Sequence, residues 1–274
     1  MTDIRLIAID LDGTLLCGQG EHKYISDYTL EVLRKAIDRG VYVAISSGRI
    51  YGDAVVYSEM IAPGQPVICS NGSMACTHDP FNVVYCECLP KPKLRSVVEI
   101  LEKEKCYYQV YCDDGAVMES RWPSPFVSKK SEVYDYAGET LSGDEMPKYV
   151  GDGALKVVCF EHDLEKLKRA RTAIEKLGGL EINSSWYTNV EILGKGVTKA
   201  AALRALAEHL GVPMEGTMAL GDNENDLSMI EAAGIGVAMG NATDAVKARA
   251  DYITATNDED GVAKAVAKFV LGEE

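Results

Sequence analysis

The chain has 274 residues, and 47% of them are hydrophobic, which is enough for one large domain or two smaller ones with buried cores. Its 42 acidic and 28 basic residues give a formal net charge of −14, which argues against nucleic acid or an anionic membrane as a partner. The eight cysteines show no paired metal-binding spacing, and no apolar run approaches the ~20 residues that span a bilayer. The first residues lead into an apolar run without a signal peptide, so we expect a cytoplasmic protein with reduced cysteines.

The first apolar run, at residues 4–10, has no polar alternation and therefore predicts a buried parallel strand. It ends in the segment Asp-Leu-Asp-Gly-Thr, which begins at Asp10. Two carboxylates separated by one residue repel each other unless a cation lies between them. Asp10 is therefore a candidate nucleophile and Asp12 a candidate acid or base, although an Asp-Gly pair after a strand is also typical of a simple turn.

The rest of the N-terminal segment alternates helices and strands. Ser26 is a candidate N-cap for a helix that Gly40 ends, and a second helix is expected at about 50–61. Apolar runs at 41–45 and 66–69 predict two further buried strands. This order of elements predicts a parallel sheet with right-handed crossovers.

The middle of the chain has a different pattern, with shorter and more polar strands. These strands are expected at 83–85, 107–111 and 116–118. Two amphipathic helices lie among them, and most of 119–150 receives no assignment. The pattern predicts an inserted α+β domain.

The first pattern returns from residue 189. Apolar runs predict strands at 217–220 and 235–238, and helices are expected at 198–210 and 244–250. We therefore expect two domains, namely a catalytic core formed by 1–84 and 189–274 and an inserted domain formed by 85–188.

Five tyrosines belong to the inserted domain: Tyr107, Tyr108, Tyr111, Tyr134 and Tyr136. Aromatic side chains on strands most often pack in a core, and this is the interpretation that we favour. The alternative is that they stack on a ring, which would indicate a cofactor or nucleotide phosphate as substrate.

Small or polar side chains follow four of the predicted core strands: Asp10 with Asp12, Ser47, Asn71 and Asp222. Ligands of an open parallel sheet bind beyond the carboxyl ends of its strands, so these side chains are candidates for one shared site. Asp10 and Asp222 together offer the carboxylate oxygens that Mg²⁺ prefers, with waters and a substrate phosphate completing its ligands. Asp222 is alternatively a simple cap of the helix that follows it.

Lys199 and the pair Ser47-Gly48 are candidate anion-binding groups. Thr198 is a predicted N-cap, so Lys199 falls in the first turn of a helix, where a cation opposes the helix dipole. A nearby phosphate would reverse that penalty, whereas an exposed lysine on a tolerant surface is the alternative. Ser47 offers a hydroxyl and Gly48 a close backbone approach to an anion. Arg49 either binds phosphate or pairs with a surface acid.

The order and spacing of these motifs resemble the haloacid-dehalogenase-like (HAD) superfamily. The matching segments are Asp10–Thr14, Ser47–Arg49, Lys199 and Gly221–Asp226, and Met239–Ala242 fits the Cof-type subgroup. The insertion at 85–188 is similar to the large C2B cap of the Cof-type phosphatases, and Ser47 keeps the hydroxyl where many relatives carry threonine. The resemblance implies a Rossmann-like α/β core with a parallel sheet and helices on both faces, plus an inserted α+β cap.

The resemblance also implies a mechanism. Asp10 attacks phosphorus and forms an aspartyl-phosphate, while Asp12 protonates the leaving alcohol and then activates water. Neighbouring carboxylates and desolvation are expected to raise the pKa of Asp12 for the acid step. Mg²⁺ is held by Asp10, Asp222 and the main-chain carbonyl of Asp12.

The implied ligands of the phosphate are the Leu11 amide, Ser47, Gly48, Lys199 and Asn225. Asp226 supports the metal or the lysine, and Asn71 and Arg49 are possible substrate contacts. The cap is expected to close over the site, exclude bulk water and choose the leaving group.

These implications predict a Mg²⁺-dependent phosphatase, a phosphoric monoester hydrolase, that acts on small phosphorylated metabolites and above all on sugar phosphates. One alternative is a phosphosugar mutase, which would use the same aspartyl-phosphate and pass the phosphoryl group to a sugar. Another is a non-catalytic module that binds a phosphorylated metabolite, although the complete set of charged residues argues against it.

Overall fold

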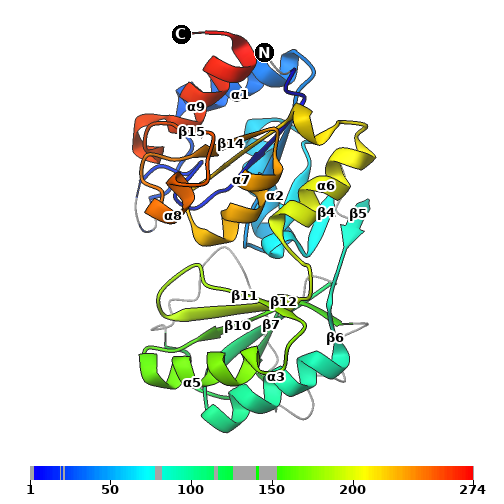
Figure 1. The fold of residues 1–274 in the computed structure, drawn as a ribbon, viewed down its shortest axis with the longest axis vertical. Helices are drawn as coiled ribbons and strands as arrows, with labels where there is room; N and C mark the ends of the chain where they lie inside the picture. The colour runs from blue at the N-terminus through cyan, green and yellow to red at the C-terminus, as the bar shows by residue number, and fades with distance from the viewer. Residues whose placement is uncertain are drawn as a thin grey trace. The chain divides into compact units, whose positions relative to one another are not determined.

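Two compact units make up the computed structural model of the chain, which describes residues 3–18, 20, 22–77, 82–113, 117–125, 140–141 and 153–273. Unit 1 joins Met1–Cys86 to Thr198–Glu274, and unit 2 is Glu87–Val197. Each unit has its own sheet (Figure 1). No helix in these residues is long and apolar enough to cross a membrane. Tyr134, Tyr136 and most of the unassigned stretch 119–150 lie outside the described residues.

The sheet of unit 1 is mostly parallel and has the strand order β15-β14-β13-β1-β2-β3-β4-β5. Its strands are β1 (Leu6–Ile9), β2 (Tyr42–Ser46), β3 (Val67–Cys69), β4 (Met74–Cys76), β5 (Val83–Cys86), β13 (Thr217–Gly221), β14 (Ile235–Ala238) and β15 (Tyr252–Ile253). All neighbours pair in parallel except β4, which is antiparallel to both β3 and β5. This arrangement confirms the predicted parallel α/β fold. The strand expected at 83–85 belongs to this sheet because it pairs with β4.

Helices pack against both faces of this sheet. They are α1 (Asp27–Asp38), α2 (Tyr51–Ile61), α6 (Lys199–His209), α7 (Leu227–Ala232), α8 (Asp244–Lys247) and α9 (Gly261–Val266), which continues as a π-helix over Ala267–Leu271. Leu6 and Ala8 of β1 belong to one apolar cluster with Leu203 of α6. Ile7 and Ile9 alternate with them and are also fully buried, so β1 has an apolar contact on each side. The predicted cap of α1 is present, since Ser26 Oγ accepts a hydrogen bond from the Thr29 amide at 3.0 Å.

Unit 2 is an α+β unit in which two helices cover one face of a sheet. The helices are α3 (Lys91–Glu104) and α5 (Leu164–Glu175), and the strands are β6 (Leu89–Pro90), β7 (Tyr107–Cys112), β8 (Val117–Ser120), β9 (Thr140–Leu141), β10 (Gly153–Phe160), β11 (Leu180–Asn183) and β12 (Asn189–Gly194). The sheet order is β11-β12-β10-β7-β8-β9, with β6 paired to β10. Buried side chains of both helices and of the central strands form one core, which includes Val97, Val157 and Ile174. The predicted inserted α+β fold is therefore confirmed.

The strand at 189–194 is placed in the core domain by the sequence, but the structure places it in unit 2. This strand, β12, pairs antiparallel with β10 and with β11. All six of its residues are buried, so its sequence looks like that of a strand in a parallel core sheet. The sequence also misses β10, whose pairing with β7 shifts register between Ala154 and Lys156. Such an irregularity breaks the alternation by which strands are predicted.

The tyrosines of β7 divide between the two faces of the unit 2 sheet. Tyr108 is fully buried in the core, and its hydroxyl donates to Glu102 at 2.8 Å, as the packing interpretation predicts. Tyr107 and Tyr111 alternate with it and so lie on the other face. Their hydroxyls donate to Glu119 at 2.7 Å and to Gln109 at 2.8 Å, so this face carries a polar network.

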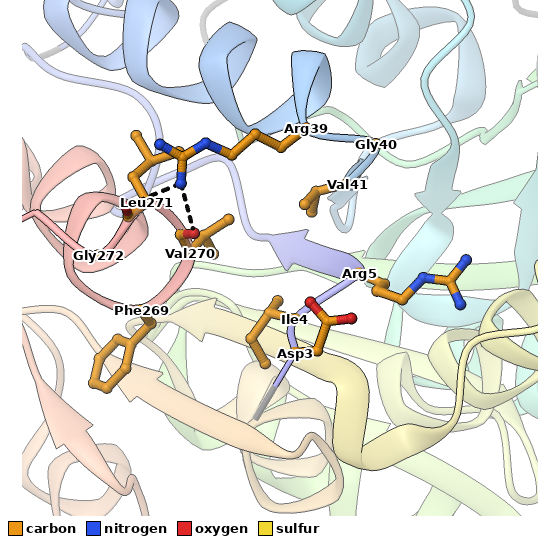
Figure 2. Close-up of a pocket in the computed structure, with 10 residues that line it drawn as sticks. All are labelled: Asp3, Ile4, Arg5, Arg39, Gly40, Val41, Phe269, Val270, Leu271 and Gly272. Atoms are coloured by element: carbon orange, nitrogen blue, oxygen red, sulfur yellow. Dashed lines mark hydrogen bonds between the residues drawn. The ribbon is translucent and has the colours of Figure 1, made fainter. Parts of the chain in front are cut away.

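A cavity of about 480 Å³ lies in unit 1 beside residues Asp3–Arg5, where the chain enters β1 (Figure 2). Arg39, at the end of α1, donates from Nη1 to the carbonyl oxygens of Val270 at 3.3 Å and Leu271 at 2.9 Å. These contacts satisfy carbonyls at the end of the C-terminal helix. The cavity is at the opposite end of β1 from Asp10, so it is separate from the predicted site.

Candidate active site

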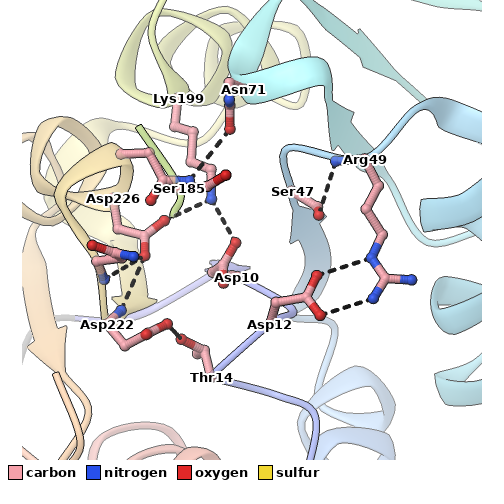
Figure 3. Close-up of polar contacts among 12 residues, drawn as sticks. Asp10, Asp12, Thr14, Ser47, Arg49, Asn71, Ser185, Lys199, Asp222 and Asp226 are labelled. Atoms are coloured by element: carbon pink, nitrogen blue, oxygen red, sulfur yellow. Dashed lines mark hydrogen bonds and ion pairs between the residues drawn. The ribbon is translucent and has the colours of Figure 1, made fainter. Parts of the chain in front are cut away.

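The carboxyl ends of four strands bring the predicted polar residues together in unit 1 (Figure 3). Strands β2, β1 and β13 are neighbours in parallel, and Ile9 is level with both Ile45 and Leu220. The residues that follow these positions therefore leave the sheet at the same edge. They include Asp10 after β1 and Asp222 after β13, so the predicted meeting of strand ends is confirmed by the register.

Lys199 lies at the centre of the site. Its ammonium Nζ is 2.6 Å from Asp10 Oδ1 and 2.6 Å from Asp226 Oδ1, and the side chain has no exposed surface. Burial disfavours the charged lysine, but the two carboxylates outweigh it and raise the lysine pKa above its usual value. The alternative of an exposed surface lysine is therefore wrong. The first helical turn of α6 fixes this position, because Thr198 Oγ1 accepts from the Ala201 amide at 3.1 Å as its N-cap.

Three carboxylates, those of Asp10, Asp222 and Asp226, gather around this lysine with ligand oxygens within 4.8 Å of one another. Burial, and then the charge of Asp226, raises the pKa of Asp10 well above the usual range. The same two causes raise the pKa of Asp222 to about 6. One lysine thus neutralises only part of the buried negative charge. A hard divalent cation such as Mg²⁺ fits this donor set, because it prefers carboxylate oxygens and would remove the remaining repulsion.

The Asp222 carboxylate is held close to the backbone of the loop that follows β1. Thr14 Oγ1 donates to Asp222 Oδ1 at 2.8 Å. Gly13 has a φ of +89°, and a Cβ at this residue would be 2.5 Å from Asp222 Oδ2. Only glycine therefore allows the loop and the carboxylate to approach so closely. This contact gives a structural reason for Gly13 and Thr14 in the segment Asp10–Thr14.

Asp226 is engaged on both of its carboxylate oxygens. Oδ1 contacts Lys199, and Oδ2 accepts from the backbone amides of Asp222 at 3.0 Å and Asn223 at 3.1 Å. These contacts fix both the lysine and the turn that carries Asp222. The predicted supporting position of Asp226 agrees with this geometry.

Asp12 is held by two basic side chains. Arg49 donates from Nε to Asp12 Oδ2 at 2.9 Å and from Nη2 to Asp12 Oδ1 at 2.8 Å, and Lys23 forms a second ion pair. Burial opposes ionisation of Asp12, but Arg49 and then Lys23 outweigh it and lower its pKa to about 2. The expected raised pKa of Asp12 is therefore wrong for this arrangement, because the dominant neighbours are cations. Arg49 pairs here with an acid, and its guanidinium also lies 5.2 Å from the centre of the Tyr57 ring.

The remaining predicted residues lie at the same edge of the sheet of unit 1. Ser47 is buried, and its Oγ accepts from the Arg49 amide at 3.2 Å. Asn71 is buried with a left-handed φ of 56°, and its Oδ1 accepts from Asn225 Nδ2 at 3.3 Å. Such strained positions occur preferentially where a ligand is bound. A Cβ on Gly48 would lie 2.9 Å from Asn71 Oδ1, so that glycine allows the two loops to meet.

Leu11 and Lys23 complete the surroundings of the two motif aspartates. Leu11 is buried between Asp10 and Asp12, and its carbonyl accepts from the amides of Thr14 at 3.3 Å and Leu16 at 3.0 Å, which closes the loop after β1. The sequence does not single out Lys23, because an isolated lysine in a polar loop carries no distinguishing pattern.

Comparisons with known proteins identify the family of the chain. The family model for haloacid dehalogenase-like hydrolases matches residues 7–266. The chain is 37% identical over 269 residues to the 5-amino-6-(5-phospho-D-ribitylamino)uracil phosphatase YcsE of Bacillus subtilis, covering 98% of this chain and 97% of that protein. It is 33% identical over 278 residues to the pyridoxal phosphate phosphatase YbhA of Escherichia coli, covering 97% and 99%.

Solved structures show the same similarity over the whole chain. A haloacid dehalogenase-like hydrolase from Bacteroides thetaiotaomicron superposes with a TM-score of 0.81 at 30% identity, covering 97% of this chain and 99% of that one. A HAD subclass IIB sugar phosphatase superposes with a TM-score of 0.80 at 28% identity, covering 97% and 98%. The resemblance found in the sequence is therefore confirmed, and the chain belongs to the haloacid dehalogenase-like hydrolase family.

Proposed function

We propose that this chain is a magnesium-dependent phosphatase that transfers the phosphoryl group of a small phosphorylated metabolite first to Asp10 and then to water. We base this on Lys199, which is buried between the carboxylates of Asp10 and Asp226 in a cluster that also includes Asp222. Membership of the haloacid dehalogenase-like hydrolases and the phosphatase names of the relatives support the class of reaction, hydrolysis of a phosphoric monoester.

Asp10 is the proposed nucleophile. Lys199 holds its Oδ1 at 2.6 Å, which fixes the carboxylate and leaves the other oxygen to attack phosphorus. A bond forms between that oxygen and phosphorus while the bond from phosphorus to the ester oxygen breaks. The ammonium of Lys199 also stabilises the negative charge of the transferring group, since it remains protonated in this site.

Asp12 is the proposed proton carrier. It gives its proton to the leaving alcohol in the first step, and in the second step it takes a proton from the water that attacks the aspartyl-phosphate. The contacts to Arg49 and Lys23 hold Asp12 in the ionised form, which is the form needed for the second step. For the first step, Asp12 must therefore separate from Arg49 and Lys23 and carry the proton that it took from water in the preceding turnover.

The phosphoryl oxygens are proposed to lie among the groups at the strand ends. Ser47 supplies a hydroxyl, Asn225 an amide, and Leu11 and Gly48 backbone amides, in addition to Lys199. Ser47 and Asn71 are buried at this edge, and Asn71 contacts Asn225, which supports a rigid arrangement of these groups. Arg49 and Asn71 are the candidate contacts to the rest of the substrate.

Mg²⁺ is the proposed cofactor, held by Asp10, Asp222 and the main-chain carbonyl of Asp12. When bound, it neutralises charge on the carboxylates and on the phosphoryl group. The raised pKa values of Asp10 and Asp222 support this assignment, because burial and then the charge of Asp226 make ionisation of both carboxyls unfavourable without a cation. Asp226 has the different task of positioning Lys199, since both of its oxygens are already engaged.

Unit 2 is proposed to act as the cap that selects the leaving group. The proposed cap is unit 2, Glu87–Val197, which extends the expected range of 85–188 at its C-terminal end to include β12. The relatives act on phosphates that differ in the alcohol, as their names show, and one structural neighbour is a sugar phosphatase. A sugar phosphate is thus one candidate substrate. A cytoplasmic location is also proposed, because the spacing of the eight cysteines shows no disulfide framework.

Replacement of Asp10 tests the mechanism. We expect the wild type to release phosphate from members of a panel of phosphate esters, and Asp10→Asn to lose at least about 1,000-fold in kcat because the amide is a poor nucleophile. The exposed Asp38→Asn is the matched control and keeps wild-type rates. Undiminished hydrolysis by Asp10→Asn would contradict the mechanism, and conversion of a hexose phosphate to its isomer without phosphate release would indicate the mutase instead.

Addition of Mg²⁺ is expected to raise the thermal unfolding midpoint, because the cation binds the folded carboxylate cluster. Between about pH 4 and the Asp222 pKa of about 6, the folded state binds more protons than the unfolded state, so stability without metal falls as pH rises. The gain from Mg²⁺ is therefore larger at neutral pH than at about pH 5. Thermal unfolding of Asp222→Asn, with Asp38→Asn as control, checks the site, and an equal gain in Asp222→Asn would refute it.

Arg49→Gln is expected to raise the pKa of Asp12 from about 2 toward its ordinary value, because the variant removes a bidentate cation. In the wild type, this pair stabilises the fold above about pH 4, and the contribution is lost as pH falls toward 2. NMR titration of labelled aspartate carboxylates measures the change, with the exposed Arg204→Gln as control. An Asp12 that still titrates near 2 in Arg49→Gln would show that Arg49 does not set its charge.

A further inference from the structure

The segment Met239–Ala242, which follows β14 in unit 1, is not used by the proposed chemistry. It forms a tight turn, since its last amide donates to its first carbonyl at 2.9 Å. A Cβ at Gly240 would lie 2.8 Å from the Thr256 nitrogen, so glycine allows the turn to lie close against a neighbouring loop. Asn241 is exposed on this turn, and both polar atoms of its side-chain amide form hydrogen bonds.

Asn241 joins two loops that are far apart in the sequence. Its Nδ2 donates to the Gly13 carbonyl at 2.7 Å, and its Oδ1 accepts from the Asn257 amide at 3.0 Å. The contact to Asn257 fixes the orientation of the side-chain amide, because the oxygen and the nitrogen each have a backbone partner. Asn241 therefore holds the backbone of the loop that follows β1.

Gly13 is the part of that loop that lies against the Asp222 carboxylate. A Cβ at Gly13 would be 2.5 Å from Asp222 Oδ2, so the backbone and the carboxylate are in close contact. The next residue, Thr14, donates from Oγ1 to Asp222 Oδ1 at 2.8 Å (Figure 3). Both carboxylate oxygens of Asp222 are thus placed by a backbone segment that Asn241 holds.

The turn that carries Asn241 also holds the main chain of Asp222. The amide of Thr243 donates to the Asp222 carbonyl at 3.0 Å. The segment 239–243 therefore contacts the Asp222 loop through its backbone and the Gly13 loop through Asn241. A cation that takes ligands from both loops depends on their separation, and removing a group that orients metal ligands typically weakens metal binding roughly 10- to 100-fold.

We propose that Asn241 is a positioning residue for the divalent cation. It holds the loop at Gly13 against Asp222, so that the carboxylates supplied by the two loops meet at the separation that the cation needs. The inference rests on the proposed magnesium-dependent function and adds a residue that prepares its metal site. Asn241 acts through Gly13 and is not itself a ligand, because backbone groups occupy both of its polar atoms.

Asn257 provides a matched control. Its Nδ2 donates to the Leu16 carbonyl at 2.8 Å, so Asn257→Ala also removes a hydrogen bond from a side-chain amide to the loop after β1. Leu16 lies three positions beyond Gly13 and does not contact the Asp222 carboxylate through any hydrogen bond that the structure describes. The backbone amide of Asn257, which supports Asn241, is kept in this variant.

Isothermal titration of MgCl₂ into the metal-free protein, without substrate, tests the proposal. We expect Asn241→Ala to weaken Mg²⁺ binding at least about 10-fold and Asn257→Ala to change it less than about twofold. Thermal unfolding without metal should be lowered similarly in both variants, since each loses one contact to the same loop. Asn241→Gln keeps the amide but displaces it by one methylene, so we expect an intermediate loss, which also decides the matter should Asn241→Ala not fold.

The outcomes separate this inference from the proposed function. Weaker Mg²⁺ binding in the Asn241 variants alone would support the positioning role even if the wild type hydrolysed no phosphate ester, a result that would contradict only the proposed reaction. Wild-type Mg²⁺ affinity in the Asn241 variants, or an equal loss in Asn257→Ala, would overturn the positioning role and leave the phosphatase proposal intact. A wild type that bound no Mg²⁺ would overturn both the positioning role and the proposed cofactor.

Discussion

The buried ammonium of Lys199 between two carboxylates is the interaction on which the site in unit 1 depends. It joins Asp10 and Asp226, which lie 189 and 27 positions away in the sequence, at 2.6 Å each. A lysine in the interior is stable only with such partners, and removing one member of a buried pair typically costs about 3–5 kcal/mol. The strand β1, the turn before α7 and the first turn of α6 must therefore arrive at one point for unit 1 to fold.

The same interaction leaves a charge imbalance that the chemistry can use. Three carboxylates share one lysine, and burial, followed by repulsion from Asp226, raises the pKa of Asp222. A divalent cation and a phosphoryl group, bound together, would satisfy both the excess acid and the lysine. Binding of both groups would therefore stabilise the carboxylates and the lysine together.

Much of this site could be predicted from the sequence because it depends on strand ends. The apolar runs of β1, β2, β3 and β13 are unambiguous, and the residue after each strand must leave the sheet at the same edge. The burial of Lys199 follows less directly, since only its unfavourable place at a helix start indicates a partner. The ion pairs of Asp12 with Arg49 and Lys23 could not be predicted from the sequence, because they depend on how two loops fold.

The fold of unit 2 was predicted less completely, because two of its strands lack a regular sequence pattern. Its central strand β10 changes register at Ala154, and β12 is buried along its whole length, so neither shows a regular alternation of polar and apolar residues. What the sequence does provide is the position of the insertion, between the last strand of the first half and the helix that begins with Lys199.

The proposed reaction requires a covalent phosphate on Asp10. Rapid acid quenching of the enzyme during a single turnover of a radiolabelled phosphate ester, followed by peptide mapping, tests it directly. We expect transient label on the peptide that contains Asp10, and we expect hydroxylamine to release it, as it does for an acyl phosphate. Release of labelled phosphate without any labelled protein, or label on a different residue, would contradict it.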